Sequence, residues 1–368
     1  MGHASGISPY RLAWPARARI LALALVLLGG AWRSQAGEPA RAESSPVTRT
    51  PTDVTVVDAG PLRLRLYLSH TAQLFHVVDQ LSEWSPFCHR QYRRALTPLD
   101  EREEESLVRY REVRARHPWG AGLEQAFYTW LPLERAVGQA VATGGLTARD
   151  AETVGEVLRR FEPKLGPLVA AEAPRLEWFL RRIQSRRGRL ADLSSKLGRW
   201  FGVSRLEVDA FLIANPSPDS FGGGFNGGRL TLEVPRAADP LPMLFHELLH
   251  AFVDPRRSSL ERRLAEAGAP GLDFETFNEG LAYALSPGIH TADGGGDDEL
   301  ALELEELSRS GATLADYRYR VLRYALALRP LVVAALESET GGFDDFVPGA
   351  IFEWRRLTAE SAAPNESN

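Results

Sequence analysis

The sequence predicts a mainly helical α+β fold with a small β-sheet. Three stretches alternate apolar and polar residues with the period of two that is typical of half-buried strands: 62–69, 205–213 and 229–234. Apolar residues recur at helical spacing over much of the remaining chain. With 368 residues, of which 44% are hydrophobic, the chain is long enough to bury a substantial core.

The expected elements divide the chain into two regions. Helical spacing dominates residues 54–200, in five segments at 74–81, 101–116, 123–141, 148–161 and 174–197. Thr147 and Asp150 are spaced like a capping pair at the start of the fourth segment. The strands expected at 205–213 and 229–234 should pair with each other. They begin a second region, at 201–358, that continues in helices. Residues 359–368 are polar and are predicted to be a disordered tail.

The first 36 residues have the pattern of a secretory signal peptide. Arginines precede the apolar run Ile20–Leu28, and Ser34 and Ala36 supply small residues at the minus-three and minus-one positions. The mature chain is expected to begin at Gly37 with a flexible linker at 37–53. These features favour export to the periplasm or the extracellular space. Because the apolar run is short for a bilayer span, a membrane anchor is the alternative.

Charge and cysteine usage narrow the classes of function. Removing the signal peptide would remove four arginines and no acidic residue, which takes the formal net charge from −5 to −9. An acidic chain without long basic runs is not expected to bind nucleic acid. Cys88, the one cysteine, excludes an intramolecular disulfide. A buried structural thiol is the favoured role for it, because a nucleophile and its base seldom align when they are sequence neighbours such as Cys88 and His89.

The motif His-Glu-Leu-Leu-His at 246–250 carries the expected chemistry of the second region. Asp239 is suited to cap a helix there, with prolines confined to its first turn. His246 and His250 would lie one turn apart on the same side, where two imidazoles can bind one tetrahedral Zn²⁺ ion. Zinc would acidify a water and polarise a carbonyl, while Glu247 would accept the water proton as general base.

A polar stripe on an ordinary amphipathic helix is the competing interpretation of this motif. The helix is, however, apolar on most sides, because Leu244, Phe245, Leu248 and Leu249 surround the polar residues. Two histidines and a glutamate would therefore be buried, which is costly unless they have partners. A metal ion removes that cost, so the zinc interpretation is favoured.

The third zinc ligand is expected to be Glu279. It lies in the string Asn-Glu-Gly-Leu-Ala at 278–282, which resembles the Asn-Glu-Gly-x-Ala string of gluzincin aminopeptidases. In that clan of zinc metallopeptidases, a glutamate on a second helix completes the site. The resemblance covers about residues 240–285 and implies a zincin-like catalytic region. The interval of 28 residues between His250 and Glu279 is longer than in those enzymes, so no single family is indicated.

Two other carboxylates compete with Glu279. Glu275 would share a helix face with it, or would instead accept a hydrogen bond from a ligand imidazole. Asp254 follows His250 by one turn but should point along the carboxyl end of the metal helix. The small residues around Glu279 are expected to let its helix approach the metal helix closely. A metzincin site is excluded, because Val253 and Arg256 stand where that class needs Gly and His.

Further roles are expected outside the metal ligands. A donor to the oxyanion should come from a later helix, although packing is the competing role for each aromatic residue. The candidates are Tyr317, Tyr319, Tyr324 and Arg320, and His290, which is expected in a loop, is an alternative donor. Strand 229–234 resembles the edge strand with which zinc peptidases pair a peptide substrate, and the glycines before it are expected to form a mobile lip. The remaining histidines are expected to be structural or surface residues: His70, His76, His89 and His117.

Together these features predict an exported zinc metallopeptidase that acts on peptide or protein substrates. A secreted helical binding protein with a non-catalytic metal site is one alternative, and a zinc hydrolase of a non-peptide amide is another. The intact Glu247 favours an enzyme. Endopeptidase and exopeptidase action both stay open, because the glycine-rich stretch holds no acidic exopeptidase motif. The sequence gives no signal for the oligomeric state and predicts no membrane span after signal cleavage.

Overall fold

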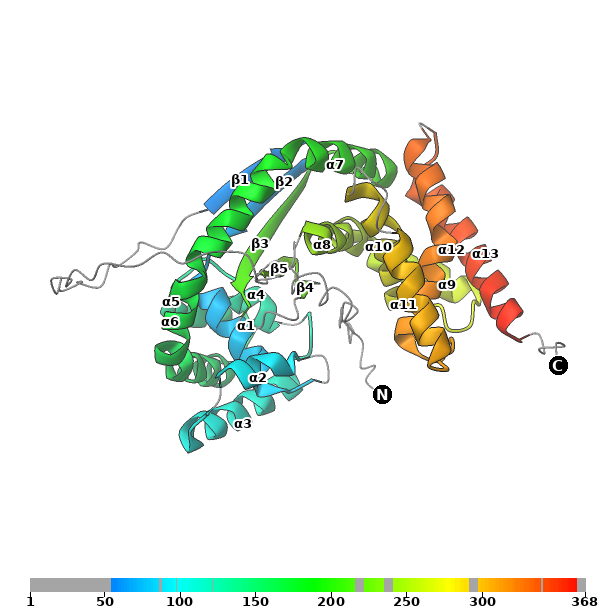
Figure 1. Cartoon of the computed structure of the whole chain (residues 1–368). Coiled ribbons are helices and arrows are strands. Elements are labelled where there is room, and N and C mark those ends of the chain that lie inside the picture. Colours follow the sequence, from blue (N-terminus) through cyan, green and yellow to red (C-terminus); the bar gives the residue numbers. More distant parts are fainter. Residues whose placement is uncertain are drawn as a thin grey trace, which may run out of the picture.

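The fold of the described part of the chain is mainly helical α+β with one small sheet (Figure 1). A computed structural model describes residues 54–85, 88–96, 98–120, 122–215, 222–234, 241–290, 297–338 and 340–362, without the side chains of 286–290, 297–299 and 362. The expected signal peptide and linker, the cap residue Asp239 and residues 363–368 lie outside these ranges.

The sheet has five strands in the order β1-β2-β3-β5-β4. They are β1 (Val54–Ala59), β2 (Leu62–Tyr67), β3 (Leu206–Ala214), β4 (Gly223–Asn226) and β5 (Arg229–Val234). The central strands β2, β3 and β5 are parallel, while β1 and β4 run antiparallel to their neighbours. The central strands confirm the three predicted ones, including the pairing of the last two. β4 was not predicted, because a four-residue strand that begins with two glycines has no apolar alternation.

Helices cover both faces of the sheet. Side chains of β3 alternate between two apolar cores: Ala210 and Leu212 lie in one, and Phe211 and Ile213 in the other. The second core is formed with α1 (His70–Ser82), α2 (Arg90–Leu96), α3 (Glu101–Arg116), α4 (Gly122–Phe127), α5 (Leu133–Ala142) and the first part of α6 (Ala148–Ser185). A strand buried on both faces is apolar along most of its length, as β3 is.

The first core contains the later helices. They are α7 (Arg187–Phe201), α8 (Leu241–Val253), α9 (Arg257–Ala267), α10 (Phe274–His290), α11 (Asp297–Arg309), α12 (Tyr317–Glu337) and α13 (Phe343–Ala362), with the short 3-10 helix η2 (Asp254–Arg256) after α8. In Figure 1 they lie on the opposite side of the strands from α1 to α5. Because α13 continues to Ala362, residues 359–362 of the expected tail are helical.

The predicted helices differ from the observed ones at two segments that contain proline. The segment expected at 123–141 is two helices, since Pro132 disfavours helical backbone in the residue before it. In contrast, α6 continues through Pro163, Pro167 and Pro174, where the sequence predicts a break. Buried side chains on both sides of these prolines hold α6 against the two cores. The predicted cap is confirmed: the Asp150 amide donates to Thr147 Oγ1 at 3.1 Å.

The glycine-rich stretch before β5 forms the edge of the sheet. β4 and β5 make a hairpin whose two-residue turn is Gly227-Gly228, with φ angles of 59° and 75°. Positive φ at both positions is typical of a type I′ turn. The prediction that 229–234 is the edge strand was therefore wrong, since β5 lies between β3 and β4. The stretch expected to be a mobile lip supplies the edge strand instead.

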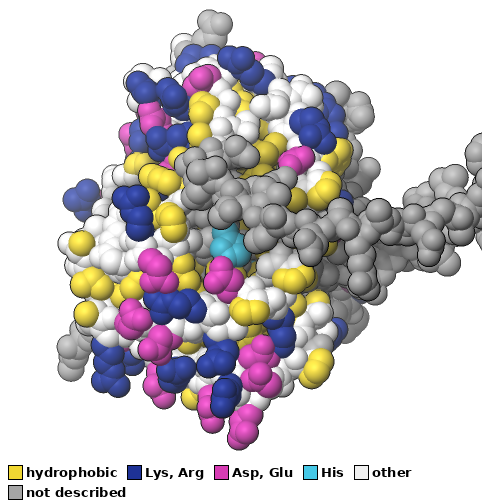
Figure 2. Space-filling model, turned by 90° about the vertical axis from the view of Figure 1, so that its left-hand side faces the viewer, with side chains coloured by type: hydrophobic (Ala, Val, Ile, Leu, Met, Phe, Trp, Pro, Cys, Tyr) yellow, Lys and Arg dark blue, Asp and Glu magenta, His cyan; other side chains and the backbone are white. Residues whose placement is uncertain are grey.

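Two surface properties concern the described part of the chain: the apolarity of its helices and the charges on one face. None of its helices combines the length and apolarity needed to cross a membrane. On the face shown in Figure 2, Lys and Arg side chains are interspersed with Asp and Glu. The described part of that face therefore lacks the extended basic patch on which polyanion binding depends.

Candidate metal centre

Helix α8 buries all the polar side chains of the motif. His246 is 2% exposed, Glu247 0% and His250 3%. The apolar residues of the same helix pack into the first core, which brings the motif inside with them. Because buried polar groups are costly without partners, the helix requires a compensating group at this place.

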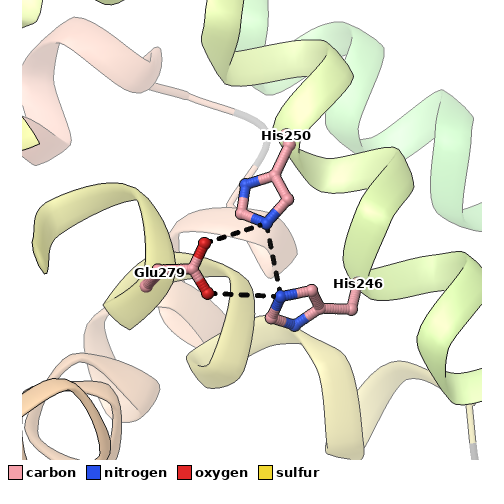
Figure 3. Close-up of side chains that lie close together, drawn as sticks. All are labelled: His246, His250 and Glu279. Carbon is pink, nitrogen blue, oxygen red and sulfur yellow. Dashed lines mark hydrogen bonds and ion pairs between the residues drawn. The ribbon is translucent and has the colours of Figure 1, made fainter. Parts of the chain in front are cut away.

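Glu279 of α10 meets the two histidines in the interior (Figure 3). The Nε2 atoms of His246 and His250 are 3.3 Å apart, and they lie 3.4 Å and 3.2 Å from the two carboxylate oxygens of Glu279. In a tetrahedral zinc site with bonds of about 2.0–2.1 Å, ligand atoms are about 3.3 Å apart. The three side chains could therefore hold such an ion. No other group of this kind is found within the described ranges.

The two competing carboxylates lie outside this cluster. Asp254 is exposed in η2 and accepts a hydrogen bond from Arg257 Nε at 3.3 Å. Glu275 accepts from Nη1 of the same arginine at 2.9 Å. Burial lowers the pKa of His250, against the opposing charge of Glu279. Glu275 is engaged by Arg257, and no hydrogen bond from it to either histidine is found among the described residues.

Glu247 lies beside the cluster, and no cationic side chain of the described residues pairs with its carboxylate. Both of its oxygens are buried without a hydrogen-bond partner among the described residues. The backbone of β4 packs against it, since a Cβ on Gly223 would lie 2.7 Å from Glu247 Cγ and 3.0 Å from Oε1. Burial and the nearby Glu279 raise the pKa of Glu247 well above its ordinary value. A cation held by the three ligands would oppose both effects, so the residues present fit a metal ion.

A chain of interactions behind His246 favours its neutral form. Burial, followed by the charge of Arg318, lowers the pKa of His246 to about 3. Neutral imidazole is the form that binds metals. The Tyr283 ring packs on His246 with 4.6 Å between centroids, and Arg318 Nη1 donates to Tyr283 Oη at 2.6 Å. Arg318 is held in turn by two hydrogen bonds to Glu303, at 2.8 Å and 2.7 Å.

The three candidate tyrosines of α12 occupy different environments. The Tyr317 hydroxyl is buried without a partner among the described residues, and burial and then Glu279 raise its pKa. Tyr319 is partly exposed, and on a helix it projects from nearly the opposite side to Tyr317. Tyr324 is fully buried and donates to the Ala350 carbonyl at 3.0 Å. Only Tyr317 of the three combines proximity to Glu279 with an uncommitted hydroxyl among the described contacts.

Gly280 allows close packing of α12 and not of the metal helix. A Cβ at this position would lie 2.6 Å from Tyr324 Cδ1. Since adjacent residues of a helix project about 100° apart, Glu279 faces α8 while Gly280 faces α12. The prediction that small residues beside Glu279 admit α8 was therefore wrong for Gly280. The glycine supports the site indirectly, by letting α12 pack against the helix that bears Glu279.

A second buried polar cluster was missed from the sequence. His76 Nε2 and His89 Nδ1 lie 2.8 Å and 3.2 Å from the carboxylate of Glu233 on β5, and Asn215 Nδ2 donates to it at 2.8 Å. Burial alone would raise the pKa of Glu233, but the two histidines lower it. The Glu233 amide donates to the Gly222 carbonyl at 2.9 Å, so this cluster anchors the start of β4. No spacing in the sequence connects the side chains that meet here.

The remaining candidates have structural surroundings. His70 pairs with Glu162 and His117 with Asp150. Cys88 is buried, and burial raises the pKa of its thiol to about 12, so a reactive thiolate is disfavoured. His290 ends α10, but its side chain lies outside the described part. Comparison with protein-family models, curated proteins and solved structures finds no match for this chain.

Proposed function

We propose that this protein is a zinc-dependent hydrolase. Catalytic zinc sites use three protein ligands and keep one position open, and a set of two histidines and one glutamate is of this type. The single observation that carries the proposal is the buried Glu247 carboxylate, which has no hydrogen-bond partner among the described residues and lies beside three convergent side chains of ligand type. A metal site that only stabilised the fold would not need this additional buried acid.

Within this class, peptide-bond hydrolysis by a gluzincin-like metallopeptidase is best supported. The HExxH motif and the Asn-Glu-Gly-Leu-Ala string resemble that clan, whose zincin-like region has a metal helix and a small sheet. The position of β4 adds a second argument, because Gly223 of this edge strand packs on Glu247. An extended peptide that adds to the sheet beside β4 would pass the acid. The signal-peptide pattern of residues 1–36 supports action outside the cytoplasm.

The chain's own groups can perform the proton transfers of this reaction. Zinc bound by His246, His250 and Glu279 would supply Lewis acidity, which polarises the scissile carbonyl and acidifies a water. Glu247 takes a proton from the water while the water oxygen forms a bond to the carbonyl carbon. It gives that proton to the amine nitrogen as the C–N bond breaks, leaving a carboxylic acid and an amine. Tyr317 donates a hydrogen bond to the carbonyl oxygen as negative charge develops there.

The test is cleavage of a mixed peptide library by the purified mature chain, analysed by mass spectrometry. We expect cleavage that stops when a chelator removes the metal and returns when zinc is added. The cleavage positions would separate endopeptidase from exopeptidase action. A zinc-loaded protein that cleaves no peptide would contradict the peptidase proposal. Cleavage that survives complete metal removal would contradict the zinc-dependent mechanism.

Replacement of Tyr317 by phenylalanine should lower activity, whereas the same replacement at Tyr324 should lower stability. Tyr317→Phe removes a donor to the developing oxyanion, so kcat should fall by about 10²–10³ with zinc content unchanged. Tyr324→Phe removes the hydrogen bond that the Ala350 carbonyl accepts in addition to its bond within α13, which should lower the free energy of unfolding by about 0.5–1.5 kcal/mol and spare activity. Steady-state kinetics and thermal unfolding of both variants provide the comparison. Equal loss of activity in the two would argue against Tyr317 as the donor.

A further inference from the structure

The hairpin turn at the end of the edge strand opens onto a cavity of about 460 Å³. The turn itself forms one wall, and α4, α5 and the segments that follow them form the others. Its lining includes Gln125, Trp130, Gln139, Thr143, Gly227 and Arg229. The cavity thus lies between the amino-terminal helices and the end of β4, the strand that packs on Glu247. A larger cavity of about 560 Å³, between α9 and the start of α10, includes Glu275 but none of the three clustered ligands.

The position of the smaller cavity follows the path of a peptide along β4. The strand begins at Gly223, which contacts Glu247, and ends one residue before Gly227 in the cavity wall. At about 3.3 Å per residue, these two glycines are about 13 Å apart. A peptide paired with β4, with its scissile bond near Glu247, would bring a residue four or five positions away to the cavity. If the peptide runs antiparallel to β4, that residue precedes the scissile bond.

The walls of the cavity favour particular side chains. Trp130 is 40% exposed, and its ring is stacked on Tyr67 with 5.3 Å between centroids, so a fixed aromatic surface faces the opening. Gln125, Gln139 and Thr143 bring amide and hydroxyl groups. Arg229 contributes a guanidinium group that Asp209 holds at 2.5 Å. No Asp or Glu occurs among the described residues that line the cavity, so a cationic ligand would find no carboxylate there.

We propose that this cavity is a remote substrate subsite that binds an aromatic, amide or acidic side chain four or five residues before the scissile bond. The inference rests on the proposed peptidase function and deepens it. The preferred substrates are extended peptides or unfolded protein segments, because a dipeptide or tripeptide cannot reach from Glu247 to the cavity. Backbone pairing with β4 supplies the connection between the two places.

The test is kcat/KM for a series of peptides with one cleavage sequence and increasing length on the amino-terminal side. We expect a rise of about tenfold or more when the fourth or fifth residue is added as tyrosine or glutamine, and a smaller rise when it is lysine. Trp130→Ala removes the aromatic wall, and Thr143→Trp fills the cavity from an exposed position. In both variants the ratio of long-peptide to short-peptide kcat/KM should fall toward one.

Trp178→Ala is the matched control, since Trp178 is 41% exposed on α6 and does not line the cavity. It should keep the ratio of the unmodified protein. Cleavage without any length dependence, or a ratio that survives in both cavity variants, would overturn the subsite while leaving the peptidase proposal intact. If no peptide of any length is cleaved, the peptidase proposal fails, and the subsite fails with it.

Discussion

Replacing Glu247 with glutamine should reduce peptide hydrolysis by about 10²–10⁴ while leaving zinc content unchanged. Glutamine has nearly the same shape, so it should fit against Gly223 as the acid does. It cannot accept the proton of the attacking water or return one to the leaving amine. Glu247 is also absent from the ligand cluster, which consists of His246, His250 and Glu279. The measurements are kcat and the molar ratio of bound zinc.

Glu275→Gln provides a matched control for this experiment. It makes the same chemical change on α10, at a carboxylate that Arg257 engages, and it should retain activity. Glu247→Gln protein with most of its activity would show that another group transfers the proton. Loss of zinc from the same variant would instead mean that Glu247 contributes to binding, and the division of roles within the motif would have to change.

The second large effect is expected at the third ligand. Glu279→Ala should weaken zinc binding by more than about 100-fold, since even the loss of a residue that only supports a ligand commonly weakens binding 10–100-fold. Two imidazoles on one helix cannot complete a site that needs three protein ligands. The measurement is zinc retained after dialysis against a mild chelator, followed by titration of the metal-free protein with zinc.

Glu275→Ala and Asp254→Ala serve as comparisons for Glu279→Ala, because both residues competed for the same role from the sequence. Each should retain zinc like the unmodified protein, as both side chains contact Arg257 and not the histidines. His246→Ala and His250→Ala should lose zinc as Glu279→Ala does. Normal zinc retention in Glu279→Ala would remove this residue from the site, and a selective loss in Glu275→Ala would assign the role there.

The predictable part of the fold was the part encoded in local patterns. The strands at 62–69, 205–213 and 229–234 alternate in polarity, and all three are observed. β4 and the continuity of α6 depend on tertiary contacts instead. A glycine-rich segment becomes a strand because β5 pairs with it, and a helix continues through three prolines because both cores bind its sides. Local propensity disfavours both outcomes, so a prediction from local sequence pattern misses them.

In the candidate site, too, local spacing predicts some residues and long-range packing brings others together. The spacing of His246 and His250 follows from one helical turn, and a motif on one helix can be read from the sequence. The approach of Glu279 was expected from a resemblance, and the structure brings its carboxylate close to His246 and His250. The meeting of His76 and His89 with Glu233 could not be expected, because the side chains come from separate elements with no fixed spacing. Long-range packing brings them together.

The parallel pairing of β3 limits how the region with the candidate metal centre can be separated from the rest of the chain. β3 opens the second region, and it is hydrogen-bonded to β5 on one side and to β2, from the amino-terminal region, on the other. A gene fragment that began near residue 201 would encode β3 with one bare edge, and such an edge invites pairing with other chains. Recombination is therefore not expected to move the helices of the candidate metal centre to another protein as an independent module. The smallest transferable unit has to include the amino-terminal strands as well.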